Sequence, residues 1–274
     1  MNKPFPIRLI ASDVDGTLLN SHGIIPEENI AAIRAAQEKG IIFAIASGRF
    51  PENVYVRIQP YGLSCPIIGV NGCHITDEKL QPIFTAAMDP SAAREVMDVL
   101  YEYKADFFMF NTHSVCTSHK DLPHHSEVTR PEDIKALGFT YYHGREEMLS
   151  CVETPVHKYY ICEGYRDDPL WKRLEKIPGI ALTQSGNSNI EVIPAGADKA
   201  TGVRMLAKHY GIPMEQVMTL GDHENDVPML QAAGYGIAMG NGTESAKAAA
   251  RFVTDTHDNH GLAKAIRKWA LVGK

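Results

Sequence analysis

The chain has 274 residues, of which 44% are hydrophobic, and a formal net charge of -6. This length accommodates a well-buried core and two domains, and the acidic balance argues against a nucleic-acid-binding protein, whose binding face is normally basic. Because no segment reaches the roughly 20 apolar residues that span a bilayer, we expect a cytoplasmic protein that makes no membrane contact.

The first candidate site follows the first apolar run of the chain. Residues 9–11 are typical of a buried strand, and Asp13 and Asp15 come directly after it. Two carboxylates held this close repel each other unless a cation or a shared proton relieves the repulsion, and Gly16 allows the chain to turn sharply behind them. The pattern therefore indicates a divalent metal site, an acid/base pair, or both, although Asp-x-Asp-Gly also occurs in ordinary turns and in calcium loops.

The next predicted elements are a helix and a second strand. Residues 26–39 have isoleucines at helical spacing, and a glycine follows directly, as is common where a helix ends. Residues 41–46 are typical of a buried strand, which runs into Ser47, Gly48 and Arg49. A hydroxyl and a glycine N–H at a strand end can hold an oxyanion, but a serine before a glycine is also common in simple turns. Arg49 either pairs within the core or faces a substrate.

The middle of the chain, residues 83–188, is richer in aromatic residues and histidines than its flanks. We predict an inserted α+β domain with an open sheet, with helices over 90–103 and 169–176 and strands over 106–110, 157–162 and 180–183. The insert is long enough to fold alone and joins the flanking blocks at two crossings, near Gln81 and Asn189. Two crossings permit hinge motion, so we expect the insert to close over the site.

Histidines and cysteines in the sequence match no metal-binding motif. We expect the histidines of the insert to be solvated or to face the substrate; they are His113, His119, His124, His125, His143 and His157. Lys158, in a predicted strand, is interpreted as structural. The cysteines are odd in number and lack a Cys-x-x-Cys pair, so we expect buried thiols; they are Cys65, Cys73, Cys116, Cys151 and Cys162.

Two further candidate segments lie in the last third of the chain. Lys199 stands at the start of a predicted helix over residues 198–210, and a predicted strand over 216–220 runs into Gly-Asp-His-Glu-Asn-Asp at positions 221–226. A lone lysine is often only a solvated charge, and an acidic cluster after a strand is often a helix N-cap. His223 either reaches a leaving group or simply belongs to the first turn of the following helix.

The order of these elements indicates a parallel sheet. Strands alternate with helices before residue 82, and again after residue 189 with a helix over 224–232 and a strand over 236–239. In such sheets ligands bind at the carboxyl ends of the strands, where all of the candidate segments are predicted to lie. We therefore predict one core domain from residues 1–82 and 189–274, with residues 83–188 inserted.

The four segments together resemble the haloacid dehalogenase-like superfamily, and within it the Cof-type phosphatases with a large cap domain. Residues 13–18 resemble the first motif of the family, 47–49 the second, Lys199 the third and 221–226 the fourth. Asn71 and Gly72 also resemble a segment that precedes the cap in this subfamily. The resemblance implies an α/β fold with a doubly wound, Rossmann-like core and an inserted α+β cap.

The resemblance also implies a role for each motif residue. Magnesium is the implied cofactor, bound by the Asp13 carboxylate, the backbone carbonyl of Asp15 and the Asp222 carboxylate. Asp13 is also the implied nucleophile, and the side chain of Asp15 the general acid/base. The groups that bind the phosphoryl oxygens are implied to be Ser47, the Gly48 N–H, Lys199 and Asn225, with Asp226 supporting Lys199 or the water shell of the metal.

The implied function is hydrolysis of small phosphomonoesters, most of all sugar phosphates, through an aspartyl-phosphate. A phosphotransferase or phosphomutase would need the same four motifs and deliver the phosphoryl group to a second hydroxyl. A non-catalytic sensor of a phosphorylated metabolite is a third reading, which the presence of both Asp13 and Asp15 disfavours. The implied partner is a small phosphorylated metabolite, and the oligomeric state and physiological substrate stay open.

Overall fold

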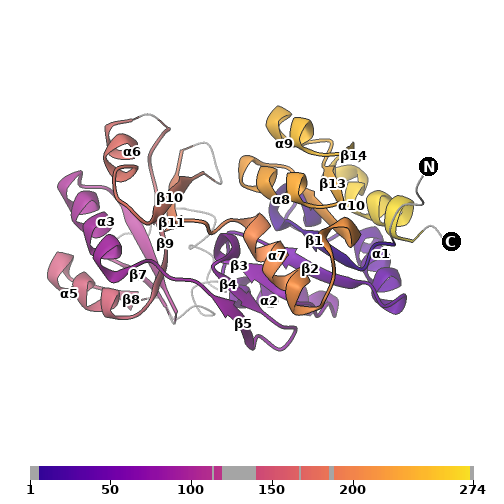
Figure 1. Cartoon of the computed structure of the whole chain (residues 1–274), viewed down its shortest axis with the longest axis horizontal. Coiled ribbons are helices and arrows are strands. Elements are labelled where there is room, and N and C mark those ends of the chain that lie inside the picture. Colours follow the sequence, from indigo (N-terminus) through magenta and orange to yellow (C-terminus); the bar gives the residue numbers. More distant parts are fainter. Residues whose placement is uncertain (1–5, 113, 119–139, 167, 185–187, 272–274) are drawn as a thin grey trace. The chain divides into compact units, whose positions relative to one another are not determined.

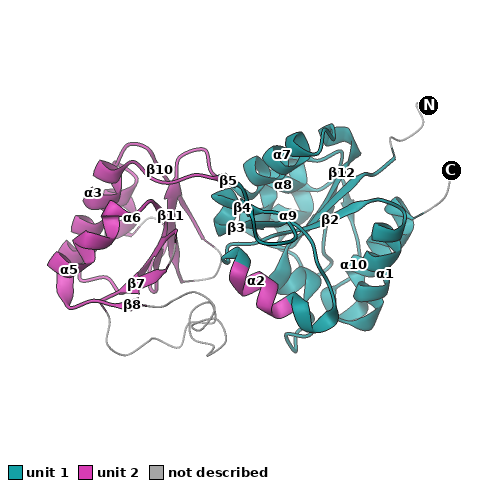
Figure 2. Cartoon of the chain, turned by 90° about the horizontal axis from the view of Figure 1, so that it is seen from below, with its two compact units in different colours: residues 1–51, 58–84, 198–274 teal, residues 52–57, 85–197 magenta. Residues whose placement is uncertain are grey.

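The computed structural model describes residues 6–112, 114–118, 140–166, 168–184 and 188–271. The chain forms two compact units, which Figure 2 shows in different colours. The larger unit comprises residues 1–51, 58–84 and 198–274, and the smaller unit comprises residues 52–57 and 85–197.

The larger unit is built on a sheet with the strand order β14-β13-β12-β1-β2-β3-β4-β5. The strands from β14 to β3 are all parallel, and β4 pairs antiparallel with β3. The strand bounds are β1 Leu9–Ser12, β2 Ile42–Ala46, β3 Ile67–Gly69, β4 His74–Thr76, β5 Pro82–Thr85, β12 Val217–Gly221, β13 Tyr235–Ala238 and β14 Phe252–Val253. Because β1 lies between β2 and β12, the chain winds outward from β1 in both directions, and such a reversal point is where parallel sheets bind ligands.

Helices cover both faces of this sheet, with α7 and α8 on one face and α1 and α10 on the other (Figure 2). The helix bounds are α1 Glu27–Glu38, α7 Lys199–His209, α8 Val227–Ala232, α9 Glu244–Ala249 and α10 Gly261–Ala265. A further helix, α2 Pro51–Ile58, has residues 52–57 assigned to the smaller unit. The short turns η1, over Val14–Leu18, and η6, over Glu224–Asp226, follow β1 and β12. The α7 face buries apolar side chains from both layers, among them Leu9, Ala44, Val203 and Leu206, and this burial holds the layers together.

The smaller unit is an α+β structure with its own sheet, of order β10-β11-β9-β6-β7-β8 (Figure 1). Its strands are β6 Phe107–Asn111, β7 Val115–Thr117, β8 Thr140–Tyr141, β9 Val156–Ile161, β10 Ile180–Thr183 and β11 Ile190–Pro194. Its helices are α3 Pro90–Glu102, α5 Gly144–Ser150 and α6 Pro169–Leu174, and they pack on one face of the sheet. Val96, Trp171 and Tyr159 belong to the buried cluster between these layers, so the smaller unit has a separate core.

The predicted fold class, a doubly wound parallel-sheet core with an inserted α+β cap, is confirmed by this architecture. The predicted boundary at residue 189 assigns the run over Ile190–Pro194 to the core, whereas in the structure this strand, β11, pairs antiparallel with β9 and β10 of the smaller unit. The five side chains of β11 are all buried, four of them apolar and one of them Glu191, and a short buried strand of this kind looks the same in either sheet. None of the helices formed by the described residues is both long and apolar enough to cross a membrane.

One expectation about the inserted segment changes. His157 is fully buried, with its ring nitrogens 3.1 Å from the Thr112 hydroxyl and 2.5 Å from the Ala86 carbonyl oxygen, so it is not solvated. Four of the other histidines, His113, His119, His124 and His125, lie outside the described residues. Lys158 is structural as interpreted, because it forms a fully buried ion pair of 3.0 Å with Glu191. All five cysteines are buried thiols, as predicted.

Candidate active site

The carboxyl ends of β1 and β12 bring the first and fourth motifs together. The two strands are parallel neighbours, with Ser12 beside Leu220, and the Asp13 N–H donates to the Leu220 carbonyl at 2.9 Å. Asp13 thus follows β1 at the point where Asp222 follows β12. Two segments more than 200 residues apart therefore meet at one edge of the sheet, as predicted for parallel strands.

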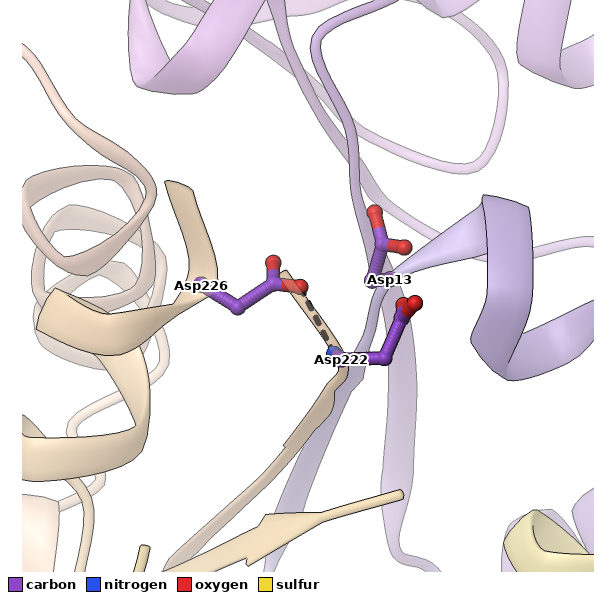
Figure 3. Close-up of side chains that lie close together, drawn as sticks. All are labelled: Asp13, Asp222 and Asp226. Carbon is purple, nitrogen blue, oxygen red and sulfur yellow. Dashed lines mark hydrogen bonds between the residues drawn. The ribbon is translucent and has the colours of Figure 1, made fainter. Parts of the chain in front are cut away.

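Three carboxylates converge at this edge (Figure 3). Each of Asp13, Asp222 and Asp226 places one oxygen within 4.8 Å of the other two. Lys199 joins them from the first residue of α7, and its Nζ donates to Asp13 Oδ1 at 2.6 Å and to Asp226 Oδ1 at 2.7 Å. Lys199, Asp13 and Asp226 are all buried, so the third motif is part of the site rather than a solvated charge.

Asp226 has both carboxylate oxygens occupied by protein donors. Lys199 bonds to Oδ1, while Oδ2 accepts from the backbone N–H groups of Asp222 at 2.9 Å and His223 at 3.0 Å. These bonds hold the turn after β12 in shape and keep Asp226 in contact with Lys199, the residue that it is expected to support.

The electrostatics of the cluster favour a further cation. Burial raises the pKa of Asp13 well above its usual value, and the nearby charges of Asp226, Asp222 and Asp15 raise it further against the opposing effect of Lys199. Burial and the charge of Asp226 raise the pKa of Asp222 to about 7. For Lys199, burial alone would lower the pKa, but the carboxylates of Asp13 and Asp226 outweigh it and raise the pKa. One lysine thus leaves an excess of negative charge, and hard oxygen ligands of this kind suit magnesium.

Gly16 shapes the first motif. Its φ of +77° lies in the region that favours glycine, and a Cβ at this position would lie 2.3 Å from Asp222 Oδ2. The sharp turn at Gly16 predicted from the sequence is therefore present, and glycine also leaves room for the fourth motif. The adjacent Thr17 hydroxyl donates to Asp222 Oδ1 at 3.0 Å, a contact that the sequence analysis did not identify although Thr17 lies within the first motif.

The second motif places Arg49 against Asp15. Arg49 Nε donates to Asp15 Oδ2 at 3.0 Å and Nη2 donates to Oδ1 at 3.2 Å, so the guanidinium grips the carboxylate at two points. This resolves the open question about Arg49, whose partner is a residue of the first motif. Ser47 and Gly48 are buried at the end of β2, and Asn225 is half-buried in the turn η6.

A second contact that the sequence analysis missed comes from Asn241. Its Nδ2 donates to the Gly16 carbonyl at 2.9 Å, and its Oδ1 accepts from the His257 N–H at 2.8 Å. The loop after β13 thereby ties the first motif to a segment near the C-terminus. The only sequence signal is a polar residue between two glycines, which by itself indicates no more than a turn.

The fold and this arrangement of four motifs define the class of the protein: the chain belongs to the haloacid dehalogenase-like hydrolases, whose family model matches residues 10–266. The expected superfamily and its class of enzyme are confirmed. Two similar proteins from Bacillus subtilis are the phosphatase YwpJ, 30% identical over 95% of this chain and 99% of its own, and the 5-amino-6-(5-phospho-D-ribitylamino)uracil phosphatase YcsE, 31% identical over 97% of this chain and 96% of its own.

Solved structures show the same architecture. A haloacid dehalogenase-like hydrolase from Bacillus subtilis superposes with a TM-score of 0.84 at 28% identity, covering 96% of this chain and 99% of the other. A phosphatase of the superfamily from Bacteroides thetaiotaomicron superposes with a TM-score of 0.81 at 26% identity, covering 97% and 96%.

Proposed function

We propose that this hydrolase is a magnesium-dependent phosphatase of small phosphomonoesters that works through an aspartyl-phosphate on Asp13. The observation that carries the proposal is the contact of Asp13 with Lys199 at 2.6 Å beside the Asp222 carboxylate. A nucleophile beside a fixed cation, with a metal-binding carboxylate next to it, supplies what phosphoryl transfer needs: positioning and neutralisation of charge. The membership of the family and the relatives named as phosphatases support the proposal.

The residues present fit a magnesium ion. The proposed ligands are the carboxylates of Asp13 and Asp222 and the backbone carbonyl of Asp15. Burial and the neighbouring carboxylates raise the pKa of both aspartates, and a bound cation would favour their ionised forms. When bound, the ion would neutralise negative charge on the phosphoryl oxygens. Asp226 orients Lys199 and the turn after β12, because its oxygens are held by Lys199, Asp222 and His223.

The proposed reaction has two displacements at phosphorus. In the first, a carboxylate oxygen of Asp13 forms a bond to phosphorus, the bond to the ester oxygen breaks, and that oxygen takes its proton from Asp15 as the alcohol leaves. In the second, a water molecule gives its proton to Asp15 and attacks phosphorus, and the bond to Asp13 breaks to release inorganic phosphate. Asp15 ends protonated and Asp13 ionised, so the cycle is closed.

Donors around the nucleophile would hold the phosphoryl group in line. Lys199 is fixed by two carboxylates, and we assign the remaining oxygens to the Ser47 hydroxyl, the Gly48 N–H and the Asn225 amide. Ser47 is itself held at the end of β2, since its carbonyl accepts from the Asn71 N–H at 3.0 Å. Donors fixed before the substrate arrives need no reorganisation during the reaction, which is the main advantage of such a site.

Sugar phosphates are the proposed substrate class. Several of the relatives, including the one at 31% identity, are named as phosphatases of a 5-phospho-D-ribitylamino compound, in which the phosphate is carried by a sugar alcohol. The leaving group of such an ester is a primary alcohol. Expulsion of a primary alkoxide requires a proton, which is consistent with a general acid in the site.

A panel of phosphomonoesters that includes pentose and hexose phosphates tests the proposal, assayed with magnesium and then with a chelator. We expect inorganic phosphate to form in equal amount to the ester lost, and activity to disappear with the chelator. A new phosphate isomer without free phosphate would instead show a phosphomutase. No turnover of any ester together with tight metabolite binding by calorimetry would show a sensor, and either result would overturn the phosphatase proposal.

A further inference from the structure

We propose that Arg49 is a positioning residue that holds Asp15 in place for proton transfer to the leaving group. The inference rests on the proposed function, because it concerns the residue assigned there as the general acid/base. It assigns a role to a side chain that has none in the proposed reaction or in the proposed metal site.

The grip of Arg49 on Asp15 is geometrically specific. Nε donates to Oδ2 at 3.0 Å, and Nη2 lies 3.2 Å from Oδ1 and 3.0 Å from Oδ2, so one guanidinium edge meets both carboxylate oxygens. A planar fork that binds a carboxylate at two points fixes its direction as well as its distance. A single lysine ammonium supplies charge without this orientation.

The two partners differ in how firmly they are held. The side chain of Arg49 is 5% exposed, whereas that of Asp15 is 59% exposed. Among the described residues, the side-chain hydrogen bonds of Asp15 all come from Arg49. The buried guanidinium is held by its surroundings, whereas the exposed carboxylate is not. Arg49 therefore determines the position of the Asp15 carboxylate.

The backbone of Arg49 is itself anchored. Its N–H donates to the Ser47 hydroxyl oxygen at 3.2 Å, and its carbonyl accepts from the Val70 N–H at 2.9 Å. Val70 and Asn71 both have positive φ, of 51° and 52°, which is uncommon for residues other than glycine and is retained where the surroundings require it. The turn after β3 therefore fixes the second motif, and through Arg49 it fixes Asp15.

Without this contact the Asp15 carboxylate would be free to rotate. Asp15 lies in the turn η1, where its φ and ψ of -81° and 122° are not helical, so no helix restrains its side chain. Proton transfer requires donor and acceptor within hydrogen-bond reach, so a rotating carboxylate transfers its proton less often. The cost should fall on the first displacement, in which Asp15 gives its proton to the oxygen whose bond to phosphorus breaks.

A double-mutant cycle on the full chain with magnesium tests the inference. The variants are Arg49→Met, Asp15→Asn and the double variant, assayed by kcat/KM on the ester that wild type turns over fastest. We expect each single variant to lose about 100-fold or more, which is the range of general acid catalysis. We expect the double variant to lose little beyond Asp15→Asn, because Arg49 acts through Asp15. If the fold-loss of the double variant equals the product of the two single losses, the residues act independently and the inference is wrong.

A leaving-group comparison supplies a readout that a merely structural role would not change. Phenyl phosphate and 4-nitrophenyl phosphate have similar shapes, but 4-nitrophenolate leaves without needing a proton. For Arg49→Met we expect the loss in kcat/KM on phenyl phosphate to exceed that on 4-nitrophenyl phosphate by about tenfold or more. Equal losses, or a rise in KM alone, would mean that Arg49 acts on the phosphoryl group or the fold instead.

Two further variants keep the test decisive. Arg49→Lys retains the buried charge and replaces Arg49→Met if that variant folds poorly. We expect it to show the same difference between the two leaving groups, because lysine lacks the planar group that binds both carboxylate oxygens. Arg204→Met is the matched control, since Arg204 is exposed on α7, and we expect it to keep wild-type kinetics. If wild type hydrolyses no phosphomonoester at all, the proposed function fails first, which separates that failure from the failure of the Arg49 inference.

Discussion

Lys199 lies between two buried carboxylates, and one of them is the proposed nucleophile. The other, Asp226, is satisfied by three donors and fixes the position of the lysine. A substitution at Asp13 therefore removes the nucleophile and leaves the ion pair of Lys199 with Asp226 in place. We therefore expect a substitution at Asp13, which bonds to phosphorus, to lower turnover more than one at Asp226, which holds Lys199.

The first prediction concerns Asp13→Asn. An amide has no charge to donate to phosphorus, so we expect kcat to fall by at least about 10³-fold. Circular dichroism should show a retained fold, because the amide oxygen still accepts from Lys199. Phosphate release is the measurement, with the intact mass checked for deamidation back to aspartate. Activity near that of wild type, at the mass expected for asparagine, would contradict the assignment of the nucleophile.

The second prediction follows from the raised pKa of Asp222, about 7 in the folded protein. In the unfolded chain an aspartate has its ordinary pKa near 4, so between about pH 4 and 7 the folded state keeps a proton that the unfolded state releases. Stability contributed by the protonated group is complete below about pH 4 and is lost as the pH rises through 7. In a chelator, Asp222→Asn should therefore become more stable relative to wild type as the pH increases.

Thermal unfolding at several pH values between about 4.5 and 8, with and without magnesium, measures this effect. We expect a difference in Tm of a few degrees at pH 8, because about 1 kcal/mol shifts Tm by about 2–4 °C in a protein of this size. Magnesium should reverse the order, since only wild type has the full set of carboxylate ligands. A constant difference across the pH range would show that Asp222 has no raised pKa.

At the scale of elements, the position of Lys199 depends on how α7 meets the turn after β3. The Asp198 carboxylate caps α7 by accepting from the Thr201 N–H at 2.6 Å. A Cβ on Gly202 would lie 2.3 Å from Ile68 Cγ2 and 3.0 Å from the Gly72 Cα. The helix therefore approaches β3 more closely than any residue with a side chain at this position would allow.

The third prediction is that Gly202→Ala lowers both stability and activity. Alanine favours a helix by about 1 kcal/mol over glycine, but overpacking costs about 1–3 kcal/mol, and a contact of 2.3 Å puts this site at the upper end. We expect a net loss of about 1–2 kcal/mol, measured by urea unfolding, and a lower kcat because Lys199 moves with the helix. Arg204→Ala, exposed on the same helix, should stay within about 0.5 kcal/mol of wild type. A higher stability of Gly202→Ala than of wild type would show that α7 does not pack this closely against β3.

The elements that carry the site could be predicted because their sequence signals are local. An apolar run followed by Asp13, and another followed by Asp222, indicate strand ends, and parallel pairing brings such ends together. The sheet to which β11 belongs could not be predicted, because five buried side chains fit either sheet equally well. The pairing of Arg49 with Asp15 spans 34 residues and depends on the turn at Gly16, so no local pattern indicates it.

At the scale of the whole molecule, each unit has a core of its own. The smaller unit also has a charged pair inside it, Lys158 and Glu191, both fully buried. Lys158 Nζ lies 4.8 Å from the centre of the Phe110 ring, directly across the sheet in the register of β6 and β9. A buried pair of this kind contributes little net stability over apolar residues, but breaking it leaves one unpaired charge.

The fourth prediction is that Lys158→Met destabilises the smaller unit selectively. Leaving Glu191 buried without its cation costs about 3–5 kcal/mol, while Lys158→Met with Glu191→Met should recover most of the loss because both charges are gone. Because the units have separate cores, amide hydrogen exchange should accelerate in β6, β9 and β11 and stay slow in β1 and β12. Magnesium affinity should be unchanged, since the proposed ligands all belong to the larger unit. Equal acceleration in both sheets would mean instead that the two units unfold as one cooperative body.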